Sequence, residues 1–136
     1  MRRFFADTFY WIALSNRRDQ WHGRVRAFNR PLRTSHLHTT DEVLAELRTF
    51  CSEGTPHTRR HAASFARNIL ADPHVTVLPQ SHASFLDALA FYASRLEKHD
   101  SLSDGVTMQA MRRDGMTDVL SNEHHFAQEG FRILFP

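Results

Sequence analysis

The first residues of the chain form a short apolar run that ends abruptly on a carboxylate. Residues 3–6 lead into Asp7 and Thr8, and a helix-like apolar segment over residues 9–14 follows. A run of this length is typical of a buried strand in a parallel sheet. A carboxylate placed directly after such a strand lies at the carboxyl edge of the sheet, where open α/β folds bind their ligands. Asp7 is therefore the reference point for the candidate site.

Strand-like and helix-like segments alternate along the rest of the chain. We expect further strands at residues 36–40, 74–78, 118–121 and 131–135, the last of them at an edge of the sheet. Helices are expected between them, at residues 21–28, 41–53, 56–70, 81–98 and 101–114. This alternation predicts a single α/β domain over residues 1–136, a three-layer sandwich whose mostly parallel sheet has helices on both faces.

Local motifs predict where some helices start and which faces they bury. Thr39 and Glu42 have the spacing of a capping box for the helix over residues 41–53. The helix over residues 56–70 is expected to turn these side chains inward: Ala62, Phe65, Ala66, Ile69 and Leu70. An i, i+4, i+7, i+11 series in the next helix predicts a core-facing stripe made of Phe85, Leu89, Tyr92 and Leu96.

Four carboxylates occupy positions that a parallel sheet can bring together. Asp7 and Glu123 follow predicted strands, whereas Glu46 and Asp104 lie near the starts of predicted helices. Glu46 lies at the edge of an apolar stripe, so its carboxylate is either solvated or compensated by a metal or an arginine. Four like charges in one pocket require a hard cation, and oxygen-only ligation favours Mg²⁺ or Mn²⁺ over zinc. Beside a phosphate, such a cation activates water for hydrolysis.

Histidines occur in three closely spaced pairs, which are His36 and His38, His57 and His61, and His124 and His125. The spacing of His57 and His61 is that of two zinc ligands on one helical face. These two histidines alternate with Arg59 and Arg60, and no third ligand or general-base glutamate accompanies them, so a zinc site is not favoured. The same reasoning is applied to the other two pairs.

The basic residues are almost all arginine. Of 17 lysines and arginines only Lys98 is a lysine, and the formal net charge is +2. Arginine binds phosphate bidentately and stacks on bases, which mildly favours a nucleic-acid partner, although a genome rich in G and C gives the same bias. Arg17, Arg18 and Arg24 are candidate RNA contacts, against the commoner alternative of a solvated helix face.

Cysteine content and hydropathy bear on the compartment. The single cysteine, Cys51, excludes an intramolecular disulfide and suits a reducing environment. No apolar stretch approaches the ~20 residues of a membrane span. We therefore expect a cytoplasmic protein with no membrane partner.

Four ordered motifs together carry a resemblance to a known family. They are FADTFYWIAL at residues 5–14, TTDEVLAEL at 39–47, DSLSDG at 100–105 and VLSNEHHFAQEGF at 119–131. With these motifs the chain resembles a PIN domain, and among PIN domains it is most similar to bacterial VapC-type toxins. The resemblance implies a parallel sheet ordered 3-2-1-4-5 and a Mg²⁺- or Mn²⁺-dependent ribonuclease. It also implies an RNA substrate, a cognate antitoxin that holds the toxin inactive, and a homodimer.

The resemblance also implies roles for individual residues. The acids that match the catalytic and metal-binding positions are Asp7, Glu46, Asp104 and, at the fourth position, Glu123. Thr8 matches the hydroxyl neighbour of the first acid, and Asp100 matches a supporting acid one turn before Asp104.

This chain departs from the family pattern at two positions. The fourth acid is usually Asp, and the longer Glu123 is expected to act through water or on a second metal, because Mg²⁺ tolerates little deviation from octahedral geometry. Phe9 stands where many relatives have a small hydroxyl residue.

Two other functional classes fit parts of the pattern. A phosphoacceptor would also carry Asp at the end of the first strand, but a phosphatase needs a second Asp at position 9, which is Phe9. A receiver domain needs a lysine at a late strand end, and Lys98 falls within a predicted helix. The other alternative is a catalytically weak PIN-fold protein that only binds RNA or a partner, against which the presence of all four acids argues.

Overall fold

Strands and helices alternate along the chain, as the sequence predicts. The computed structural model describes residues 2–29, 35–51, 55–95 and 101–136. Its strands are β1 (Arg2–Ala6), β2 (Ser35–Thr40), β3 (Val75–Leu78), β4 (Asp118–Leu120) and β5 (Arg132–Ile133). Its helices are α1 (Thr8–Ser15), α2 (His22–Asn29), α3 (Asp41–Cys51), α4 (Pro56–Ala71), α5 (His82–Ala93), α6 (Leu102–Arg113) and α7 (His124–Gln128). Over the described ranges, no helix has the length and hydropathy needed to cross a bilayer.

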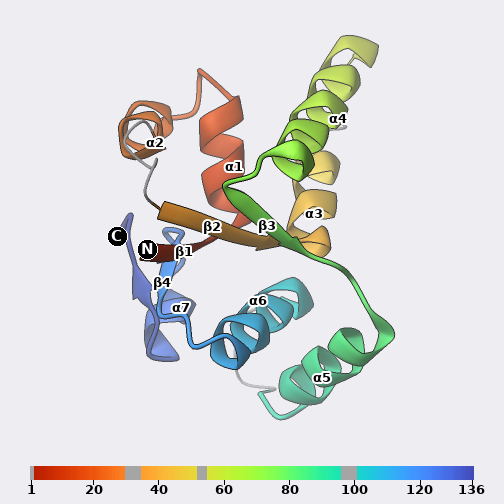
Figure 1. The fold of residues 1–136 in the computed structure, drawn as a ribbon, viewed down its shortest axis with the longest axis vertical. Helices are drawn as coiled ribbons and strands as arrows, with labels where there is room; N and C mark the ends of the chain where they lie inside the picture. The colour runs from red at the N-terminus through yellow and green to blue at the C-terminus, as the bar shows by residue number, and fades with distance from the viewer. Residues whose placement is uncertain (1, 30–34, 52–54, 96–100) are drawn as a thin grey trace.

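All five strands form one parallel sheet in the order β3-β2-β1-β4-β5. Figure 1 shows α1, α2, α3 and α4 on one side of this sheet and α5 and α6 on the other. The expected sheet order and the expected three layers are therefore confirmed, and β5 lies at an edge as predicted.

The central strand β1 positions the candidate site. Its last three residues are buried, because helices cover both faces of the sheet. The register with β4 pairs Ala6 with Leu120, so the two strands end side by side. Asp7 and Ser121, the residues that follow these two strands, are therefore neighbours at the carboxyl edge of the sheet.

The start of α3 differs from the expected capping box. Thr39 is buried, and its hydroxyl donates to the carbonyl of Ala6 at 3.0 Å and accepts from Nε1 of Trp11 at 3.2 Å. The cap is Thr40 instead, whose Oγ1 accepts from the backbone N–H of Val43 at 3.1 Å. The prediction of Thr39 as the cap is wrong, because its hydroxyl is already used to join β2 to β1 and α1.

The predicted core stripe of α5 faces outward instead. The exposed fractions on α5 are 39% for Phe85, 48% for Leu86, 43% for Leu89 and 48% for Tyr92. Leu70, near the end of α4, was also expected to face inward but is 57% exposed. The buried contact of α5 with α6 is made by Ala88, close to Gly105, where an added Cβ would lie 3.7 Å from the Ala88 carbonyl. Small residues let the two helices approach closely, which leaves the bulky stripe outside. Leu96 lies outside the described residues.

Candidate metal centre

Asp7 is buried between the last residue of β1 and the first residue of α1. It occupies the N-cap position of α1 but makes no side-chain capping hydrogen bond, and only 5% of its surface is exposed. Its Oδ2 accepts a hydrogen bond from Oγ of Ser121 at 3.0 Å. Ser121 Oγ in turn accepts from the backbone N–H of Glu123 at 3.1 Å. One serine hydroxyl thus connects the first acid with the backbone of the last.

The surroundings of Asp7 disfavour its charged form. Burial raises the pKa of Asp7 to about 7, with a further contribution from the negative charge of Asp104 and a smaller one from Glu123. The hydrogen bonds from Thr8 and Ser121 act in the opposite direction and only partly offset these effects. Asp104 and Glu123, from two other parts of the chain, are therefore close enough to Asp7 to oppose its ionisation.

Asp104 is fixed by the start of α6. The backbone N–H of Ser101 donates to Oδ2 of Asp104, and the N–H of Asp104 donates to Oγ of Ser101, each at 3.1 Å. This reciprocal capping box holds the carboxylate in one orientation. The Asp104 side chain is 15% exposed, and Met108, one turn later, is fully buried. Asp104 therefore both caps α6 and lies on its inward side.

The ring of His125 lies between the carboxylates of Asp104 and Glu123. Nε2 of His125 is 3.0 Å from Oδ2 of Asp104, and its Nδ1 is 3.2 Å from Oε2 of Glu123. The donor atoms of these three residues all lie within 4.8 Å of one another. Burial, and then the charge of Asp104, raise the pKa of Glu123, while His125 lowers it. The cluster has the size and donor types of a site for a divalent cation.

The other predicted site residues lie around this cluster in different ways. Glu46 is exposed on α3, so its carboxylate is solvated and needs no arginine to compensate its charge. Its charge nevertheless contributes to the raised pKa of Glu123. Thr8 is buried beside Asp7, and its Oγ1 finds no hydrogen-bond partner within the described part of the chain. Asp100 lies outside the described residues.

The three candidate RNA-contacting arginines lie near the far end of α1. This helix begins beside Asp7 and has 8 residues, about 12 Å of rise, so Arg17 and Arg18 follow its opposite end. Arg17 lines a surface pocket of about 410 Å³ between α1 and α2. The guanidinium of Arg24 lies 4.5 Å from the ring centre of Trp21. The fold does not bring these arginines to the acids, and RNA contact by them stays a prediction.

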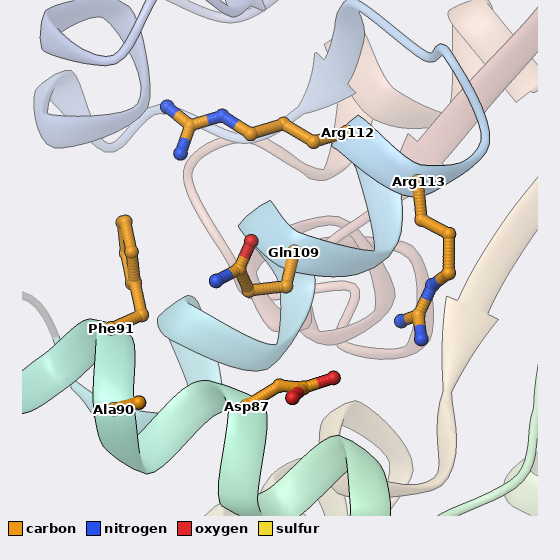
Figure 2. Close-up of a pocket in the computed structure, with 6 residues that line it drawn as sticks. All are labelled: Asp87, Ala90, Phe91, Gln109, Arg112 and Arg113. Carbon is orange, nitrogen blue, oxygen red and sulfur yellow. The ribbon is translucent and has the colours of Figure 1, made fainter.

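A second surface pocket also lies away from the carboxylates. It has a volume of about 680 Å³ between α5 and α6, and Figure 2 shows Asp87 and Arg113 reaching toward it from the two helices. Its lining also includes Phe91 and Gln109, but none of the four predicted acids.

Sequence reasoning missed two members of the cluster, Ser121 and His125. Ser121 directly follows β4, just as Asp7 directly follows β1. This equivalent position in the sequence could have indicated that the two side chains meet. Sequence spacing assigns no ligand role to His125, whereas the fold places Asp104 of α6 beside it and so completes a group of three possible ligands with Glu123. Of the described histidines, His125 alone belongs to a metal-compatible group.

Comparisons with known proteins place the fold in a recognised group. No protein-family model matches the sequence, and no curated protein matches it. Among solved structures, a sarcin-ricin loop cleaving toxin, VapC20 of Mycobacterium tuberculosis, is 25% identical, with a TM-score of 0.81 over 98% of this chain and 99% of that one. VapBC2 of Rickettsia felis, solved bound to a DNA fragment from their promoter, gives a TM-score of 0.64 at 12% identity, over 93% of this chain and 92% of that one.

Proposed function

We propose that this chain, a PIN-like domain most similar to VapC-type toxins, is a divalent-metal-dependent endoribonuclease that hydrolyses phosphodiester bonds in RNA. The observation that carries the proposal is the gathering of Asp7, Asp104 and Glu123 at the carboxyl edge of the sheet. The full-length likeness to a toxin described as cleaving the sarcin-ricin loop supports RNA as the substrate.

Two observations support a cation at this position. The pKa of Asp7 is raised to about 7, chiefly by burial and then by Asp104, as expected for acids crowded together without a counter-charge. Nε2 of His125 is buried and lacks a hydrogen-bond partner among the described residues. Asp7, Asp104 and Glu46 would hold Mg²⁺ or Mn²⁺. When bound, the ion supplies Lewis-acid chemistry that lowers the pKa of water and offsets negative charge on the phosphate.

The protein's own residues provide fixed geometry and a proton acceptor. Ser121 holds the Asp7 carboxylate, and the capping box holds that of Asp104, so neither needs to reorganise when substrate binds. Glu123 is half exposed and has a raised pKa, so its carboxylate is suited to accept a proton from the attacking water.

The direct test compares RNA cleavage with and without metal. Purified protein is incubated with a panel of structured RNAs in Mg²⁺, in Mn²⁺ or in EDTA. We expect cleavage with either metal and none in EDTA. Binding of RNA without cleavage under all three conditions would favour the alternative of a PIN-fold binding protein.

Glu123→Gln is expected to slow cleavage by only ~10–100-fold, the range typical of groups outside the first coordination shell. Its side chain is 48% exposed and follows a three-residue strand, so its carboxylate is less fixed than those of Asp7 and Asp104. Glu46→Gln should cost far more, because Glu46 is proposed to bind the ion directly. Single-turnover rates across a Mg²⁺ series measure both, and equal losses would place Glu123 in the first shell.

The proposed partners are an antitoxin and a second copy of the chain. The likeness to a VapBC complex supports an antitoxin. The exposed stripe of α5, which includes Leu86 and Leu89, has the apolar character of an interface, and we assign it to the homodimer.

Leu89→Asp is expected to convert the dimer to a monomer without unfolding it, because Leu89 is 43% exposed and a charge there would be buried only in the interface. Light scattering after size exclusion measures the mass. Gln128→Asp, at an exposed position on α7, is the control and should remain dimeric. A wild-type monomer at all concentrations would contradict the assignment.

A further inference from the structure

We propose that His125 binds the divalent ion through Nε2, which makes the centre a mixed oxygen and nitrogen site that prefers Mn²⁺ to Mg²⁺. The inference rests on the proposed function, because it concerns the ion which that function requires. It goes beyond the acidic set by assigning a ligand outside the four carboxylates.

The first observation is the state of the Nε2 atom. It is buried, and it finds no hydrogen-bond partner among the described residues. Oδ2 of Asp104 lies 3.0 Å away, but the approach does not have hydrogen-bond geometry. A buried polar atom without a partner is costly, and such atoms in a folded protein call for an explanation. An ion bound at this nitrogen supplies the missing interaction.

The second observation is the spacing of the donor atoms. In an octahedral site with bonds of about 2.1 Å, two neighbouring ligand atoms lie about 3.0 Å apart. The distance from Nε2 of His125 to Oδ2 of Asp104 is 3.0 Å. The two atoms are therefore already spaced as adjacent ligands of one ion.

The third observation concerns the other ring nitrogen. Nδ1 of His125 lies 3.2 Å from Oε2 of Glu123. Metal-binding histidines usually donate their second N–H to a carboxylate, which fixes the tautomer and the ring orientation. With an ion at Nε2, the ring proton would be on Nδ1, where Glu123 Oε2 can orient it, in addition to the role of Glu123 toward the attacking water.

The helix that carries His125 is held by a buried side chain at its centre and by ion pairs after its last residue. Phe126, the next residue, is fully buried. Glu129, which follows the last residue of α7, is ion-paired with Arg95 of the chain segment after α5, and with Arg112 of α6 at 2.9 Å. The ring is therefore presented from a fixed element, as a ligand requires.

The donor set predicts the choice of ion. Imidazole nitrogen binds first-row transition ions better than it binds Mg²⁺, which prefers oxygen ligands and keeps its waters. A site with one nitrogen among carboxylates therefore shifts its preference from Mg²⁺ toward Mn²⁺.

The test uses Mn²⁺ as a paramagnetic probe of its own ligands. Full-length protein at pH 8 is loaded with Mn²⁺, and electron spin-echo spectroscopy detects coupling to a ligand nitrogen. We expect this coupling in wild type and in His124→Gln, an exposed neighbour on the same helix, and its loss in His125→Gln. Calorimetry should show that His125→Gln weakens Mn²⁺ binding by about 10-fold or more and Mg²⁺ binding much less.

The outcomes separate this inference from the proposed function. Mn²⁺ binding without nitrogen coupling, or coupling that survives in His125→Gln, would overturn the assignment of His125 and leave the metal-dependent nuclease standing. Absence of any Mn²⁺ or Mg²⁺ binding to wild type would overturn both. Far-ultraviolet circular dichroism of His125→Gln establishes that a lost signal does not come from unfolding.

Discussion

Asp7→Asn is expected to abolish RNA cleavage and, in the same protein, to raise the melting temperature of the metal-free state at pH 8. The amide has no charge with which to hold a divalent ion, so we expect the rate to fall by roughly 10³-fold or more. At pH 8 the wild-type carboxylate is ionised although it is buried and faces Asp104. Asparagine removes that charge and can still accept the hydrogen bond from Ser121. Differential scanning calorimetry and single-turnover cleavage measure the two effects.

Asp118→Asn is the matched control for this substitution. Asp118 is the first residue of β4, at the end of that strand away from Asp7, and its carboxylate accepts two hydrogen bonds from Arg132 at 2.9 Å. Its replacement should leave cleavage unchanged and lower the melting temperature, the opposite of the effect expected for Asp7→Asn. If Asp7→Asn instead melted well below wild type at pH 8, Asp7 would be a structural residue and not a functional one.

The metal-free wild type is expected to lose stability as the pH rises from about 4 to about 7. Unfolded Asp7 releases its proton near its ordinary pKa of 3.8, whereas burial, and then Asp104, hold the folded pKa at about 7. Between these values the folded state binds more protons than the unfolded state, so the free energy of unfolding falls with pH. Three pH units at about 1.4 kcal/mol each give a loss of roughly 4 kcal/mol.

Urea denaturation at several pH values measures this slope. Other groups also titrate, so the informative quantity is the difference between wild type and Asp7→Asn, which should widen up to pH 7 and then level off. Saturating Mn²⁺ should restore stability to the wild type, because a ligand that binds only the folded state stabilises it. Parallel profiles for the two proteins would mean that the Asp7 pKa is not raised by folding.

The strand pattern was sufficient to predict a parallel sheet with helices on both faces, whereas the strand order was implied by the resemblance to PIN domains. Apolar runs such as residues 3–6, separated by helices with recognisable caps such as Thr55 and Ser81, leave few arrangements other than a parallel sheet. The convergence of Asp7 with Glu123 followed from the same logic, because parallel strands end at one edge. These inferences depend only on backbone topology, which local patterns encode well.

The details that sequence reasoning missed depend on contacts between distant segments. From the sequence, Thr39 and Thr40 are equally good candidates for the cap of α3. Only the pairing of β2 with β1 shows that the Thr39 hydroxyl binds the Ala6 carbonyl, which leaves Thr40 as the cap. The apolar stripe of α5 has the period of a buried face, and only the close approach of Ala88 to Gly105 shows that the helix packs on another side. His125 gains its neighbour from α6, and no local spacing predicts that pair.

The contact between Asp7 and Ser121 also determines when in folding the centre is completed. The two residues are 114 positions apart in sequence, and they meet only when β4 pairs with β1. Closing so long a loop is slow, whereas β1 and β2 pair across a much shorter connection. During synthesis, β1, β2 and β3 are therefore made before the residues that complete the acidic cluster. A nascent chain therefore has no assembled acidic cluster until β4 and the start of α7 have left the ribosome.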